Sequence, residues 1–221
     1  MTERKISLIC EDSGEGILSA IYIAYEKKLK PETTKIECFP IENYELFTEY
    51  IELKTDRDKA EKVENTVSKR FGNLTAYSIW CCIYSNQREK ADIIYHAIAR
   101  GLANNIRGEL ITYLQDPYIM DLVKIQRNVS NEAHHFKGFL RFTELEDRTL
   151  FAKICPKNQV LPLLASHFVD RLGEENFVIY DEKYKVCLLH EKEQEPYLYY
   201  PGEKEREKIE NMDKKFSEKE I

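Results

Sequence analysis

The longest regular pattern in this sequence is an apolar repeat that begins at Asp116-Pro117 and continues for about twenty residues. Asp is favoured at a helix N-cap and Pro in the first helical turn, so this dipeptide predicts the start of a helix. The apolar side chains that recur on one face of the helix are Tyr118, Ile119, Leu122, Ile125, Val129, Ala133 and Phe136. Gly138 is expected to end it. The helix separates two portions of the chain with different patterns.

The portion that contains this helix, residues 116–195, alternates between helical patterns and paired strands. Short alternating runs on either side of polar turns predict hairpins, and an apolar stripe closed by Gly173 predicts a second helix. The elements expected after the first helix are a hairpin of Phe139–Leu145 and Leu150–Cys155, a helix at Gln159–Leu172, and a hairpin of Phe177–Tyr180 and Lys185–His190. Residues 196–221 follow as a charged tail of Lys and Glu.

Residues 1–115 show a mixed strand and helix pattern that ends in a helical cluster. Gly14 and Gly16 occupy a polar turn between the first strand and the first helix, but the third glycine of a dinucleotide loop is absent, so we interpret both as turn residues. The expected elements are strands at Lys5–Cys10, Lys35–Phe39 and Tyr50–Lys54, a helix over Ile17–Tyr25, and helices at Asp56–Arg70 (N-cap Thr55), Leu74–Tyr84 and Ala91–Leu102. The fold class is therefore α+β, with a helix-hairpin-helix-hairpin portion second.

Composition and cysteine spacing exclude several classes of protein. With 43% hydrophobic residues, 8 Gly and 7 Pro, the chain is neither fibrous nor broadly disordered. It has no apolar run long enough for a membrane helix and no secretory signal, so we expect a cytoplasmic protein with no membrane partner. The 6 cysteines lack metal-site spacing and are interpreted as reduced core thiols. We expect neither a metal nor a cofactor.

The charge of the chain is unevenly distributed. The formal net charge of −6 argues against a protein that coats nucleic acid nonspecifically. The stretch Lys124–Lys157, however, holds seven basic residues against four acidic ones, which is +3, and the rest of the chain is −9. A basic, aromatic-rich segment in an acidic chain is what a focused phosphate contact needs. Ordinary solubility of exposed faces explains the same excess.

The segment Asn131–Phe142 holds most of the candidate site residues. His134 is admissible as a general acid or base, with Glu132 as the accompanying carboxylate, although helical spacing puts the two on different flanks. Capping of the helix end, or packing in a half-buried slot, is the stronger explanation of His134. Arg141 is expected in mid-strand, either paired with Asp170 or Asp181 or available to an anion.

Further basic candidates lie outside that segment. His167 and Arg171 are four residues apart near the end of the second helix, where capping of the last carbonyl groups also explains them. Lys153 belongs to the basic stretch. The residues assigned to nucleic-acid or anion binding are Lys137, Arg141, Lys153, His167 and Arg171.

An uncharacterised bacterial family assigned to DNA metabolism and DNA repair has a segment similar to Glu132–Phe142, which reads EAHHFKGFLRF in this chain. The resemblance covers roughly Ile6 to His190. It includes Pro156, His167-Phe168, Arg171 and Val178–Asp181. The recurring polar positions of the family correspond to Glu132, His134, Lys137, Arg141, His167, Arg171 and Asp181. Where the family usually has a Trp- and Arg-containing segment near its end, this chain has the Lys/Glu tail.

Members of that family are encoded beside a radical SAM protein and are in some bacteria fused to a uracil-DNA-glycosylase-like domain. The resemblance therefore implies a radical SAM partner and a role on DNA. We consider three hypotheses. The first is an accessory protein of DNA metabolism or repair that contacts nucleic acid or its partner through the basic helix-hairpin junction. The second is an enzyme that acts on a modified nucleotide or other anionic substrate, with His134 as the proton-transfer group, and the third is a scaffold that binds only a protein.

Overall fold

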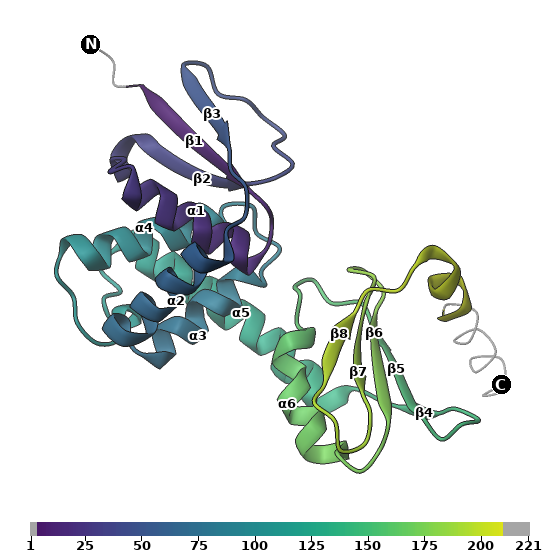
Figure 1. The fold of residues 1–221 in the computed structure, drawn as a ribbon. Helices are drawn as coiled ribbons and strands as arrows, with labels where there is room; N and C mark the ends of the chain where they lie inside the picture. Colours follow the sequence, from purple (N-terminus) through teal and green to yellow (C-terminus); the bar gives the residue numbers. More distant parts are fainter. Residues whose placement is uncertain (1–3, 210–221) are drawn as a thin grey trace. The chain divides into compact units, whose positions relative to one another are not determined.

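The computed structural model describes residues 4–209, which form an α+β fold as the sequence predicts (Figure 1). The contacts divide the chain into two compact units, Met1–Val129 and Ser130–Ile221. The division falls inside helix α5 (Pro117–Phe139), whereas the sequence pattern changes at residues 115–116. The first turns of α5 make their contacts in the first unit, and the last turns in the second.

The first unit is built on a three-stranded parallel sheet in the order β2-β1-β3. Helix α1 connects β1 to β2 and packs on both strands, and α4 packs on β2, the edge strand. The bounds are β1 Lys5–Cys10, α1 Gly14–Glu26, β2 Thr34–Cys38, β3 Thr48–Glu52, α2 Arg57–Phe71, α3 Asn73–Ile83 and α4 Lys90–Ala103, with short 3-10 turns at Pro31–Thr33 and Leu110–Thr112. The N-cap of α2 is Asp56, which accepts from the N–H of Lys59, and not Thr55, whose hydroxyl donates to Glu11.

The two glycines of the first turn of α1, Gly14 and Gly16, have a steric explanation. A Cβ at Gly14 would lie 2.5 Å from the Trp80 ring, and one at Gly16 would lie 2.4 Å from the carbonyl oxygen of Glu11. Ser13 caps α1 by accepting from the N–H of Gly16. The interpretation of both glycines as residues of a turn before the helix is wrong, because both lie in the first turn of α1 and neither has a positive φ. Close packing, and not backbone freedom, accounts for them.

The second unit is a five-stranded sheet in the order β4-β5-β6-β7-β8, with α6 packed on it. Strands β5 and β6 are parallel and are joined through α6, and the other pairs are antiparallel. The bounds are β4 Thr143–Glu144, β5 Leu150–Ile154, α6 Leu161–Leu172, β6 Phe177–Asp181, β7 Val186–His190 and β8 Tyr197–Tyr199. A helical segment covers 203–209, and residues 210–221 of the predicted charged tail lie outside the described residues.

The main core of the second unit lies between the sheet and its helices. Side chains of α5, α6 and alternate positions of the strands meet there, among them Ala133, Phe168, Phe177 and Ile179, all nearly inaccessible to solvent. The opposite face of the sheet has a smaller cluster of Phe151, Tyr180 and Cys187, against which Ile209 packs.

The strand predicted at Phe139–Leu145 is wrong over most of its length. Helix α5 continues to Phe139, residues 140–142 have no regular structure, and only Thr143–Glu144 pair with β5. Gly138 does not end the helix, because it lacks the positive φ that a glycine C-cap uses. The N–H of Leu140 instead bonds to the carbonyl of Phe136 and completes the last turn.

The cysteines are free, and four of them are buried, namely Cys10, Cys81, Cys82 and Cys187. Cys38 is half-buried and Cys155 is exposed, so the prediction of core thiols is wrong for Cys155. Within residues 4–209, none of the helices is both long enough and apolar enough to cross a membrane.

Candidate functional site

The end of α5 and the three residues after it present an apolar side to the core and a polar side to solvent. Phe136, Leu140 and Phe142 pack against the main core, and the Phe142 ring lies 5.4 Å from the Phe168 ring. The remaining side chains face outward. We call the set His134, His135, Lys137, Phe139 and Arg141 the α5-end surface; Lys137 is half-buried and the other four are exposed.

Glu132 is one turn before this surface and is bound by a different part of the chain. Its carboxylate accepts from the N–H of Lys157 at 2.6 Å, the N–H of Asn158 at 3.0 Å and the side-chain amide of Asn158 at 2.7 Å. Asn158 is only 1% exposed. The structure therefore brings Glu132 together with the loop between β5 and α6, and not with His134. Its contacts hold α5 against that loop.

The turn between β6 and β7 joins the same network. Tyr184 donates its hydroxyl to the carbonyl of Lys157 at 2.7 Å, and the ammonium of Lys183 donates to that carbonyl as well. Asp181 Oδ1 accepts from the N–H groups of Lys183 and Tyr184 at 2.9 and 3.0 Å. Glu132 thus holds α5 to the loop after β5, and Tyr184 and Lys183 hold the β6–β7 turn to the same loop. Asp181 braces its own turn. We call these contacts the Glu132 clamp.

Asp181 is fully buried, and its second carboxylate oxygen, Oδ2, has no hydrogen-bond partner among the described residues. Burial raises the pKa of Asp181 above its ordinary value, and the nearby Glu132 carboxylate raises it further, while the two N–H donors act in the opposite direction. A buried carboxylate of this kind costs folding free energy when it is ionised.

The cations of the α5-end surface have no carboxylate partner. Within residues 4–209, neither Lys137 nor Arg141 forms an ion pair or a hydrogen bond. Of the two alternatives for Arg141, pairing with Asp170 or Asp181 is not observed: among the described residues neither Arg141 nor Asp170 forms an ion pair, and Asp181 accepts from N–H groups of its own turn. Arg141 is outside any strand, so its guanidinium is free to reach solvent.

The other basic residues predicted for binding are placed differently. Lys153 pairs with Glu182 at 3.8 Å across the sheet. Arg171 is exposed on α6, and in the described part of the chain it has no ion pair. The His167 ring lies 5.0 Å from the ring of Phe168, edge to face, and its Nε2 is buried without a hydrogen-bond partner. The His167 side chain therefore packs against the Phe168 ring of the same helix instead of capping the carbonyl groups at the helix end.

The two exposed histidines differ in their neighbours. The His135 ring lies 4.8 Å from the Phe139 ring with an interplanar angle of 33°. Four cavities among the described residues are lined by other side chains, and His134 contributes to none of these four. A proton-transfer group needs a bound substrate within reach, and ligand sites for small molecules are concave. None of these four cavities offers His134 such a site.

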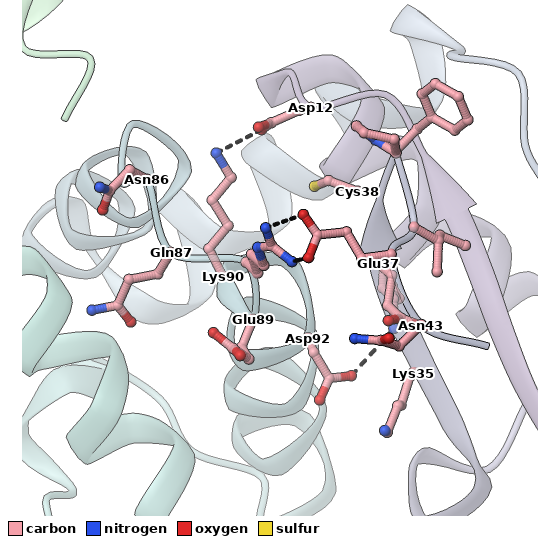
Figure 2. A pocket seen from close by; sticks show the side chains of 16 residues that line it. Asp12, Lys35, Glu37, Cys38, Asn43, Asn86, Gln87, Glu89, Lys90 and Asp92 are labelled. Atoms are coloured by element: carbon pink, nitrogen blue, oxygen red, sulfur yellow. Dashed lines mark hydrogen bonds and ion pairs between the residues drawn. The ribbon is translucent and has the colours of Figure 1, made fainter. Parts of the chain in front are cut away.

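A polar cavity of about 410 Å³ in the first unit was not anticipated from the sequence (Figure 2). It lies beside the ends of β1 and β2 and the start of α4. Lys90 is only 2% exposed there and donates to the carbonyls of Ile83 and Ser85, both at 2.9 Å, while pairing with Asp12 at 2.6 Å. Arg88 pairs with Glu42 at the cavity edge.

Lys90 and Asp12 are paired with each other, as the dashed contact between them in Figure 2 shows, and Arg88 and Glu42 form a second pair. Asp92 is used in the same way, because it accepts from the N–H of Ile36 on the edge strand at 3.2 Å. A buried Lys with three partners stabilises the local fold, since removing any partner would leave a buried charge or carbonyl unpaired. Across residues 4–209, no group of three or more His, Cys, Asp or Glu side chains is arranged to hold a metal ion.

Comparison with known proteins places the chain in a family. The family described as a domain of unknown function, DUF4130, matches residues 88–219, and the chain therefore belongs to that family. The matched region begins at Arg88, beside the polar cavity, and contains the Glu132 clamp and the whole α5-end surface. No match was found among curated proteins.

The Glu132 clamp makes a prediction about stability. Replacing Glu132 with Ala should lower the free energy of unfolding by about 2–4 kcal/mol, because the N–H groups of Lys157 and Asn158 lose their acceptor. Glu132→Gln keeps an acceptor oxygen and should lose roughly half as much. Urea unfolding followed by circular dichroism measures both. Glu146→Ala, at an exposed turn position, is the control, and a Glu132→Ala midpoint equal to that of the control would contradict the assignment.

Asp181 makes a prediction about pH. Because its pKa is raised in the folded state, the folded protein holds this proton more tightly than the unfolded chain, and stability falls as pH rises through the folded pKa. Asp181→Asn keeps an oxygen for the N–H groups of Lys183 and Tyr184 but has no proton to lose. The variant should therefore gain stability relative to the natural protein between about pH 4 and pH 7 in urea unfolding. A relative loss over that range would show that ionised Asp181 is stabilising.

Proposed function

We propose that this protein is an accessory protein of DNA metabolism or repair that contacts DNA through the α5-end surface. The observation that carries the proposal is that the side chains of half-buried Lys137 and exposed Arg141, at the end of α5, have no carboxylate partner among the described residues. Cations without carboxylate partners are available to phosphate groups, and their binding releases counterions from the nucleic acid. The resemblance of Glu132–Phe142 to a DNA metabolism family points to the same ligand.

The surrounding charges favour this use of the two cations. The nearest carboxylate along α5, Glu132, is engaged by three N–H donors and does not neutralise them. Lys137 also lies in the last turn of α5, where a positive charge offsets the partial negative charge of the helix end. Arg141 is beyond that end, and this electrostatic role does not account for it. With a chain charge of −6, binding should be confined to this surface.

The two other hypotheses have less support from the structure. An enzyme based on His134 needs a cavity next to that side chain, and His134 contributes to none of the four cavities considered above among the described residues. A purely structural junction would have Arg141 buried against a carboxylate, and Arg141 is exposed. We retain a radical SAM protein as the proposed partner, because the resemblance implies it; copurification of the two proteins from cells that express both tests that part.

The DNA contact predicts a salt-dependent affinity. For the natural chain, the logarithm of the binding constant for single-stranded DNA should fall linearly with the logarithm of salt concentration. In Lys137→Gln/Arg141→Gln, binding should weaken and the slope should become shallower by about 1.4, since each lost phosphate contact removes about 0.7. Fluorescence anisotropy of a labelled oligonucleotide provides both quantities.

A matched control is Lys69→Gln/Arg107→Gln, which removes the same two residue types from exposed positions of the first unit. This control changes the net charge equally and should leave affinity and slope nearly unchanged. Equal losses in both double variants would mean that only the overall charge matters. Absence of salt-dependent binding by the natural chain would overturn the proposal.

A further inference from the structure

The aromatic pair of the α5-end surface is unusual in its exposure. Phe139 is 72% exposed although it lies in a helix whose neighbouring positions, Phe136 and Leu140, pack on the core. Its ring does have one partner, the His135 ring one turn earlier at 4.8 Å. His135 and Phe139 thus lie on the solvent side of the end of α5, next to half-buried Phe136 and Leu140.

An exposed ring held in this way offers one open face. Contact with His135 restricts the Phe139 side chain, so less rotamer freedom is lost when a second planar group stacks on the ring. Planar groups that stack on aromatic rings next to phosphate-binding cations are nucleobases. A base can reach the ring only if it is not already stacked and paired inside a duplex.

Arg141 is the cation of this surface that suits such an occupant. It follows Phe139 by two residues, beyond the end of α5, is exposed, and in the described part of the chain its guanidinium has no carboxylate partner. Lys137 precedes Phe139 by two residues within the helix and therefore projects from a different flank of α5. Arg141 can attract the phosphates of a single strand whose base stacks on the ring.

We propose that Phe139, supported by His135, is a stacking platform for an unpaired base, so that the α5-end surface selects single-stranded over double-stranded DNA. This inference rests on the proposed function and specifies its substrate class. Lys137 and Arg141 supply the attraction that any DNA backbone shares, and Phe139 supplies the preference for accessible bases. Selectivity and affinity are thus assigned to different side chains of one surface.

The test compares three labelled probes of equal length, about twelve nucleotides. They are oligothymidine, a duplex, and a strand with the same backbone whose nucleotides lack bases. The natural full-length chain should bind oligothymidine best, at least about fivefold more tightly than the baseless strand, because stacking of one base contributes that much. Phe139→Ala should abolish this difference while leaving binding of the baseless strand unchanged. Phe139→Trp should preserve it.

Phe47→Ala is the matched control, since Phe47 is 90% exposed in the first unit and should affect none of the probes. Circular dichroism and thermal unfolding establish that each variant is folded. Equal binding of all three probes by the natural chain, or a Phe139→Ala variant that keeps the preference for oligothymidine, would overturn the stacking platform and leave the proposed function standing. Failure of the natural chain to bind any probe would overturn the proposed function itself.

Discussion

The three hydrogen bonds that the Glu132 carboxylate accepts from N–H donors determine how the end of α5 is held in the second unit. Those donors belong to Lys157 and Asn158, in the loop that follows β5. Because the carboxylate is bound there, it fixes the direction of α5 relative to the sheet of the second unit. It also leaves the cations after it without an internal counterion. One contact therefore serves both packing and the charge of the α5-end surface.

At the end of α5, the side chains that face the core contribute to stability, and the side chains that face solvent are the ones we assign to DNA binding. Phe136 and Leu140 contribute to the main core together with Phe142, whose ring packs on Phe168 and Phe177. His135 and Phe139 face solvent. Substitutions of these two residues should change binding without much loss of stability, since they remove little buried apolar area.

The local sequence pattern predicted many of the helices and strands, but it did not predict the long-range contacts of the candidate site. Capping residues and apolar spacing located α5 from Asp116 and both strands of the β6–β7 hairpin. They failed at Gly138, where helix propagation competed with a glycine stop signal, and Arg141 was assigned to a strand as a result. The partners of Glu132 are 25 and 26 residues away, and those of Lys90 include Asp12. Helical or strand periodicity carries no information about such pairs.

Mapping the backbone amides that respond to bound DNA tests directly whether the end of α5 is the binding surface. In a nuclear magnetic resonance titration of the full-length chain with oligothymidine, we expect the chemical-shift changes to be concentrated between His134 and Arg141, and the amide signals of Lys157 and Asn158 to stay unchanged. Changes concentrated around Lys90 and the polar cavity, with the end of α5 unaffected, would show that DNA does not bind at the α5-end surface.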